Sequence, residues 1–248
     1  MTFKDYFSRQ AADYATYRPR YPADLFAWLG QQCQQRTLAW DCATGNGQAA
    51  IALTQYFQQI IATDGSADQL SQATRHPQIT YRIALAEQSE LHPQTMDLIT
   101  VAQAVHWFQL EKFYAEVHRV LQPKGLLAVW CYGVPILDSS PLDAVLVDFY
   151  RNTLEPFWPP ERRIVEAGYR TLPFPFEEIV APAFAMQVAW TLPQLLGYLF
   201  TWSGTQKFIA AEQYNPLEKL AEQLSAAWTG DRQSMHWPIN LRAGVLKN

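Results

Sequence analysis

The chain has 248 residues, of which 49% are apolar and 17% charged, and this composition excludes an intrinsically disordered protein. With 19 basic and 23 acidic side chains, the formal net charge of -4 provides no uniform basic face for binding nucleic acid. No apolar run approaches the roughly 18 residues that a membrane span requires, and the first residues, MTFKDYFSRQ, lack the apolar core of a signal peptide. The three cysteines, Cys33, Cys42 and Cys131, form no CxxC pair and favour a reducing compartment, so we expect a cytoplasmic protein.

The first half of the chain alternates short apolar runs with helical patterns. A helix is predicted near residues 25–33, followed by strands near 38–41, 60–63, 79–84, 96–101 and 126–131. Between them, helices are predicted from the turn at 43–47 to about 57, after Ser66, and along the apolar stripe from Leu110 to Leu121. This alternation is typical of βαβ units in a parallel sheet.

Beyond residue 133, proline and aromatic residues become dense and the alternation is lost. Helices are predicted at Pro141, after the Thr191 and Gln194 capping box, and after Pro216, with strands near 184–190 and 235–246. We expect a single domain over residues 1–248, with a lid and first helix at 1–35 and a cofactor-binding core at 36–132. Residues 133–248 are expected to form a substrate cap of inserted helices and returning strands.

A glycine turn directly after the first strand is the main functional signal. Gly45 and Gly47 allow a ligand to approach the backbone, and the helix that follows offers unpaired N–H groups. Asp64 comes 19 positions after Gly45, at the end of the second strand, where a carboxylate can accept both hydroxyls of a ribose. These features predict an adenosine-containing cofactor, either a nicotinamide or flavin dinucleotide or S-adenosylmethionine.

Asp41 favours S-adenosylmethionine over a dinucleotide. It precedes the glycine turn, where its carboxylate would repel a pyrophosphate but attract an ammonium and a sulfonium. The structural alternative is that Asp41 only caps the turn.

Several motifs carry a resemblance to a known family. The sequence Asp41-Cys42-Ala43-Thr44-Gly45-Asn46-Gly47 resembles the D-x-G-x-G-x-G turn of the class I S-adenosylmethionine-dependent methyltransferases, and the resemblance covers roughly residues 10–132. Residues 96–99 and 120–125 resemble the fourth-strand and R-V-L-x-P-G-G signatures. Residues 14–25 and 103–108 look most like the type 11, trans-aconitate-methyltransferase-like group. The resemblance implies a Rossmann-like, mostly parallel seven-stranded sheet with helices on both faces.

The same resemblance implies the cofactor, S-adenosyl-L-methionine, with S-adenosyl-L-homocysteine as product, and the residues that bind it. These are Tyr14, Arg18, Asp41, Ala43, Gly45, Gly47, Asp64, Gly65, Gln69, Ala86, Glu87 and Gln103. Asp64 would hold the ribose, while Gln69, Ala86 and Glu87 would border the adenine. Two of these cofactor residues depart from the family pattern: Gln69 is polar where an apolar residue is common, and Ala43 replaces a glycine. Ala43 is expected to be tolerated only with a negative φ.

The acceptor site is predicted from residues beyond the fourth strand and in the second half. His106, Trp107, Arg162 and Trp202 are the candidate substrate residues, and Arg18 and Arg163 are further candidates for contacting an anion. An aromatic cluster would either wall the acceptor pocket or belong to the core: Phe157, Trp158, Tyr169, Phe174, Phe176, Tyr198 and Trp202.

His106 is the candidate catalytic residue, and its role depends on the acceptor. A carboxylate acceptor needs no base, whereas a hydroxyl would need one, for which His106 is the best-placed group. The alternative is a histidine that packs beside Trp107. No histidine spacing indicates a metal site.

The sequence therefore predicts an S-adenosylmethionine-dependent methyltransferase that acts on an oxygen of a small molecule, a carboxylate or a hydroxyl. The expected partner is this acceptor, and neither nucleic acid nor a membrane. Two alternatives remain open at this point: a non-catalytic S-adenosylmethionine-binding accessory or regulatory protein, and an NAD(P)-dependent oxidoreductase.

Overall fold

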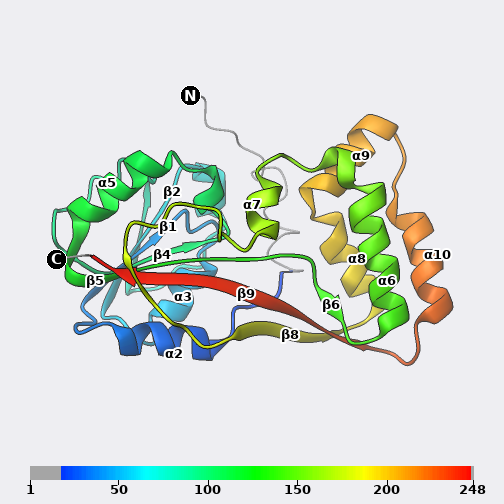
Figure 1. Cartoon of the computed structure of the whole chain (residues 1–248), viewed down its shortest axis with the longest axis horizontal. Helices are drawn as coiled ribbons and strands as arrows, with labels where there is room; N and C mark the ends of the chain where they lie inside the picture. The colour runs from blue at the N-terminus through cyan, green and yellow to red at the C-terminus, as the bar shows by residue number, and fades with distance from the viewer. Residues whose placement is uncertain (1–17, 247–248) are drawn as a thin grey trace.

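A twisted sheet runs the length of the molecule in the computed structural model, which describes residues 18–246 (Figure 1). Its strand order is β3-β2-β1-β4-β5-β9-β6, and β7 and β8 both pair with β9. The first five strands are parallel to one another, and β9 is antiparallel to β5. The prediction of a Rossmann-like fold is confirmed.

The five parallel strands match the predicted apolar runs. They are β1 (Leu38–Cys42), β2 (Gln59–Asp64), β3 (Ile79–Ile83), β4 (Met96–Ala102) and β5 (Leu121–Tyr132). β4 is buried over all but its last residue, as expected for a parallel strand covered on both faces. Because parallel strands end at one edge of the sheet, the turns after β1, β2 and β4 lie together there.

Alternate residues of β1 face different helices. Ala39 packs with apolar residues of α2 (Ala23–Gln32) and α3 (Gln48–Leu53), whereas Trp40 packs with α5 (Leu110–Val120) on the opposite face. The predicted helices are confirmed, including the short α4 (Ala67–Ser71), whose first turn is capped by the Ser66 hydroxyl. α3 is shorter than predicted and gives way to a turn after Leu53.

The second half returns to the sheet through one long strand. β9 (Gln233–Val245) pairs with β5 along its later residues and with β8 (Phe184–Trp190) along its earlier ones. The predicted number of seven strands is wrong, because the described residues form a nine-stranded sheet. The two additional strands, β6 (Ile136–Leu137) and β7 (Glu177–Ile179), are too short to leave an alternating pattern in the sequence.

Helices of the second half gather at one end of the molecule, beyond the parallel strands (Figure 1). They are α6 (Ser140–Asp148), α8 (Leu192–Phe200), α9 (Ser203–Glu212) and α10 (Leu217–Ala227). We call this group the helical cap. The Thr191 and Gln194 capping box at the start of α8 is confirmed. α7 (Arg162–Glu166) lies between the cap and the parallel strands, and neither it nor α9 was predicted.

No helix in the described part of the chain is long and apolar enough to cross a membrane.

Candidate active site

The turn after β1 has the open backbone that a bound cofactor requires. Gly45 and Gly47 adopt positive φ angles of 57° and 85°. A Cβ added at Gly45 would have Gln69 Oε1 as its nearest neighbour, at 3.7 Å, so this side of the turn is open. A Cβ at Gly47 would collide with the Tyr81 hydroxyl, so this glycine is required by packing as well as by backbone conformation.

Ala43 contradicts the prediction that it keeps a negative φ. Its φ is +53°, in the left-handed region that disfavours side chains with a Cβ. The turn from β1 to α3 imposes this conformation, since Thr44 N–H donates to the Thr63 carbonyl at 2.9 Å and Gly47 N–H donates to the Thr44 carbonyl at 3.0 Å. The tertiary hydrogen bonds therefore override the local preference of alanine.

Asp64 closes the turn from the neighbouring strand. Its Oδ2 accepts a hydrogen bond from Gly45 N–H at 2.8 Å, and its Oδ1 accepts one from Ser66 N–H at 2.9 Å. A carboxylate has about four lone-pair sites in all, so its hydrogen bonds are not limited to these two. A carboxylate beside an open glycine turn fits the ribose and adjoining part of an adenosine cofactor.

The Asp41 side chain is buried and stabilises the turn through hydrogen bonds. It is 1% exposed, and its carboxylate accepts hydrogen bonds from the hydroxyls of Thr44 and Thr100, the latter at 2.7 Å. Burial raises the pKa of Asp41 to about 6, against the opposing effect of the two threonine hydrogen bonds. This geometry matches the structural alternative, in which Asp41 caps the turn.

The other predicted cofactor residues lie around the same edge. Gln69 is buried beside Gly45, Gly65 follows Asp64 directly, and Ala86 is buried after β3. The Glu87 carboxylate accepts a hydrogen bond at 2.8 Å from Gln109 N–H, at the start of α5. Tyr14 lies outside the described residues.

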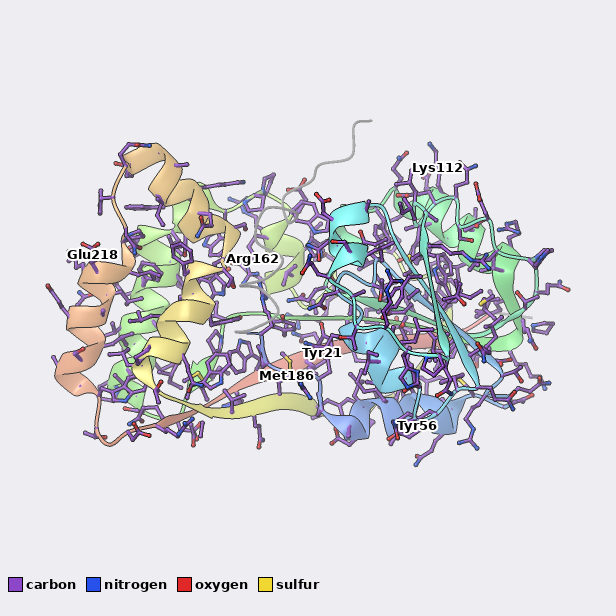
Figure 2. The ribbon with its side chains drawn as sticks, turned by 180° about the vertical axis from the view of Figure 1, so that it is seen from behind. Tyr21, Tyr56, Lys112, Arg162, Met186 and Glu218 are labelled. Carbon is purple, nitrogen blue, oxygen red and sulfur yellow. The ribbon has the colours of Figure 1, made fainter. Side chains whose placement is uncertain are left out.

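A cavity of about 90 Å³ lies where the helical cap meets the ends of β4 and β5. Its described lining residues are Arg18, Gln103, His106, Trp107, Tyr132, Gly133, Trp158, Pro159, Arg162, Val165, Tyr198, Trp202 and Ser203. All four residues predicted for the substrate, His106, Trp107, Arg162 and Trp202, are thus brought together here. Figure 2 shows Arg162 between the cap and the sheet, on the side of the cap that faces the strands.

Two arginines enter this cavity and each rests on aromatic rings. Arg18 donates from Nη1 to the Tyr132 hydroxyl at 2.9 Å and lies 5.3 Å from the Tyr198 ring centroid. Arg162 donates from Nε to the Tyr150 hydroxyl at 2.6 Å and lies 5.0 Å from the Trp158 ring centroid. None of the described residues that line the cavity is Asp or Glu, so the charged side chains of this described lining are the two arginines.

Gln103, which was predicted to bind the cofactor, lines this cavity and holds the backbone of Tyr132, another lining residue, in place. Its side-chain Nε2 donates to the Tyr132 carbonyl at 3.0 Å, and its Oε1 accepts from the Tyr132 N–H at 3.3 Å. Gln103 has a φ of +56°, a conformation that these paired hydrogen bonds help to maintain. The side chain thus fixes the end of β5, from which Tyr132 enters the cavity.

His106 contacts the cavity on one side and a buried tyrosine on the other. Its Nδ1 lies 2.8 Å from the Tyr169 hydroxyl oxygen. Burial, with the nearby charge of Arg162, lowers the pKa of His106 to about 3, so the ring is neutral at physiological pH.

The predicted aromatic cluster divides into three groups. Trp158, Tyr198 and Trp202 line the cavity, and Tyr169 lies behind His106. The others pack elsewhere: Phe174 and Phe176 against Tyr114 on α5, and Phe157 against Phe208 on α9.

Of the two adjacent arginines, Arg162 lines the cavity and Arg163 is exposed.

Sequence reasoning missed Tyr132 as a cavity residue. Its place at the carboxyl end of the fifth parallel strand is a signal that could have found it, because ligands bind at this edge.

Cys33, Cys42 and Cys131 are all buried free thiols. No group of His, Cys, Asp and Glu within residues 18–246 has the arrangement of a metal site.

Comparisons with known proteins agree with this geometry. A family profile described as a methyltransferase domain matches residues 40–129. A Dictyostelium discoideum protein named "Putative methyltransferase" is 32% identical over 96% of this chain and 92% of its own length. A solved structure from Anaeromyxobacter dehalogenans, described as a "Putative Type II Methyltransferase", is 42% identical with a TM-score of 0.88, covering 94% of this chain and all of that one.

A more distant solved structure, the YcgJ protein of Bacillus subtilis, shares the fold at 17% identity and a TM-score of 0.53, over 92% of this chain and 100% of that one. The glycine turn closed by Asp64, the strand order and these relatives lead to one conclusion. The chain belongs to the class I, type 11 S-adenosylmethionine-dependent methyltransferases and is an enzyme with S-adenosylmethionine as its cofactor.

Proposed function

We propose that the protein methylates a carboxylate oxygen of a small organic acid bound in the cavity between the sheet and the helical cap. One observation carries this proposal: the cavity has two arginines, Arg18 and Arg162, and no acidic side chain among its described lining residues. A carboxylate in such a site would be attracted by both guanidinium groups and repelled by no acidic side chain among these lining residues.

Arg162 has the geometry of an anion-binding group. Its Nε is held by Tyr150 and its guanidinium plane rests on Trp158, while Nη1 and Nη2 make no hydrogen bond with the described residues. Tyr150 in turn donates to the Glu166 carboxylate, which lies outside the cavity lining. A guanidinium fixed through Nε keeps its two terminal nitrogens for a bidentate contact with a carboxylate.

The chemistry required of the protein is modest for such an acceptor. S-adenosylmethionine, when bound, supplies a methyl group on a positively charged sulfur. An ionised carboxylate is already a nucleophile, so the protein has to bind it, orient it and exclude water. Trp158, Tyr198 and Trp202 provide apolar walls for this purpose. A hydroxyl acceptor would need a base, and His106, with its pKa lowered to about 3, is poorly matched to that task.

An acceptor screen tests the proposal directly. The enzyme is incubated with methyl-labelled S-adenosylmethionine and pairs of small acids and their uncharged amides, and labelled product is measured. We expect turnover of one or more acids and none of the matched amides. Turnover of an amide as fast as its acid would contradict the proposal.

Two arginine variants provide the matched control. Arg162→Met should raise the KM for the acid about ten- to a hundredfold, because a charge-assisted contact is lost. Arg163→Met, which alters an exposed neighbour on α7, should leave this KM unchanged. Both variants should bind S-adenosylhomocysteine like the wild type, which separates acceptor binding from cofactor binding. An unchanged KM in Arg162→Met would remove this residue from the acceptor site.

A further inference from the structure

The Tyr169 hydroxyl is buried against a single partner. Tyr169 is 0% exposed, and within the described residues its hydroxyl pairs with Nδ1 of His106 at 2.8 Å. A buried hydroxyl that donates to nothing costs roughly 1–3 kcal/mol. We therefore assign the hydroxyl of Tyr169 as the donor of this hydrogen bond and Nδ1 of His106 as its acceptor.

This direction fixes the protonation of the histidine ring. A neutral imidazole has one N–H, so an Nδ1 that accepts a hydrogen bond leaves the proton on Nε2. Nε2 makes no hydrogen bond within residues 18–246, and His106 lines the cavity. Nε2–H is thus available as a donor in the cavity that Arg162 also lines.

We propose that His106 binds the acceptor's carboxylate as a neutral hydrogen-bond donor through Nε2–H, and that Tyr169 is a positioning residue that holds the ring in this tautomer. The proposal rests on the proposed function, since it assigns a role toward the same acid. It replaces the view of His106 as a general base, because a base would need an unprotonated Nε2 facing the acceptor.

The backbone around Tyr169 is held firmly in an unfavourable conformation. Tyr169 has a φ of +61° and follows Gly168, which also has a φ of +61°. The Arg242 Nη1 group donates to the carbonyls of Tyr169 at 3.0 Å and Leu172 at 2.7 Å. Arg242 is paired with Glu178 at 2.6 Å, so β7 and β9 together fix the backbone from which the phenol projects. Strained backbone of this kind persists where surrounding contacts determine it.

The charges around His106 agree with a neutral donor. The charged or titratable side chains that share the cavity with it are Arg18, Arg162, Tyr132 and Tyr198, and Cys131 acts on the Tyr169 phenol from behind. Burial disfavours a protonated imidazole, and the charge of the Arg162 guanidinium does so as well. Burial also raises the pKa of Tyr169 well above its ordinary value, so the phenol keeps the proton that it donates.

The tautomer can be measured without any acceptor. Nitrogen-15 correlation spectra of the imidazole rings distinguish a protonated ring nitrogen from an unprotonated one. The signals of His106 are assigned as those that disappear in the His106→Gln variant. We expect a bare Nδ1 and a protonated Nε2 that persist from pH 5 to 8. A proton on Nδ1, or an imidazolium within this range, would overturn the proposal. Because no turnover is involved, this outcome is independent of whether the enzyme methylates acids.

Kinetics with a turned-over acid separate a donor from a base. His106→Gln places an amide donor near the position of Nε2, whereas His106→Leu removes the donor and keeps an apolar side chain. For a donor, we expect the leucine variant to raise the acceptor KM about ten- to a hundredfold with little change in kcat, and the glutamine variant to recover much of the loss. A fall in kcat of about 10²–10⁴-fold in both variants would instead identify a base and contradict the proposal.

Tyr169→Phe tests the positioning role. Loss of the phenol hydroxyl should let the His106 ring proton exchange between the two nitrogens, which the same spectra detect. Circular dichroism checks that the variant is folded. Should it not fold, the spectrum of the wild-type ring alone still decides which nitrogen carries the proton. An unchanged tautomer in a folded Tyr169→Phe would show that Tyr169 does not fix it.

Discussion

The backbone N–H of Gly45 donates a hydrogen bond to Oδ2 of Asp64 across 2.8 Å, and this contact joins the turns that follow two neighbouring strands. β1 and β2 are parallel, with Cys42 paired in register with Thr63, so both strands end at the same level. The carboxylate therefore holds the glycine turn in shape and also lies where the ribose is expected. This side chain therefore stabilises the turn, and we predict that it also binds the cofactor.

Asp64→Ala should consequently affect binding and stability together. We expect the affinity for S-adenosylhomocysteine, measured by calorimetry, to fall about ten- to a hundredfold through loss of charge-assisted hydrogen bonds. The free energy of unfolding without cofactor should also fall by about 1–3 kcal/mol, because Gly45 and Ser66 each lose an acceptor. The control is Asp68→Ala, an exposed acid nearby, for which both quantities should stay near the wild-type values. Wild-type affinity in a folded Asp64→Ala would remove Asp64 from the cofactor site.

Ala43→Gly should stabilise the protein, although most glycine substitutions destabilise. The φ of +53° costs alanine roughly 1–2 kcal/mol, part of which is offset by the greater freedom of glycine in the unfolded chain. We expect urea denaturation to show a gain of about 0.5–1 kcal/mol. Ala167→Gly is the matched comparison, since its φ is -72° and the same change should lower stability. A loss of stability in Ala43→Gly would show that Ala43 does not have a positive φ in the folded protein.

The buried Asp41 predicts a pH dependence of stability. Its pKa rises from 3.8 to about 6 on folding, so between these values the native state binds more protons than the unfolded state. Stability from this group is therefore present below about pH 4 and is lost as the pH rises through 6. The lost stability amounts to about 3 kcal/mol at most.

Asp41→Asn removes this titration and keeps a side-chain oxygen for the threonines. The difference in free energy of unfolding between Asp41→Asn and the wild type should grow in favour of the variant from pH 4 to pH 7. Urea denaturation of both proteins across this range measures it. A difference that stays constant with pH would mean that Asp41 does not titrate there.

Much of the parallel core could be predicted from the sequence because its signals are local. Each buried strand is an apolar run, and the glycine turn and Asp64 follow two of these strands directly. His106 and Arg162 lie in one cavity although they are 56 positions apart, and their contribution to an acceptor site stays a prediction. The position of His106 just after the fourth strand and the positive charge of Arg162 are the signals that the sequence contains.

The features that the sequence did not predict depend on contacts between distant segments. The positive φ of Ala43 follows from hydrogen bonds to β2, and nothing in an alanine indicates it. α7 has five residues, too few for a helical pattern, yet it carries Arg162 into the cavity. The contact of Tyr169 with His106 spans 63 positions, so only the folded chain shows which nitrogen of the ring is engaged.

The position of the transferred methyl group tests the central claim most directly. The enzyme is supplied with S-adenosylmethionine labelled with carbon-13 in the methyl group and with an acid that it turns over, and the product is analysed by mass spectrometry and NMR. We predict a single added methyl group on a carboxylate oxygen, giving a methyl ester. A labelled methyl group on nitrogen or carbon would contradict the proposed function.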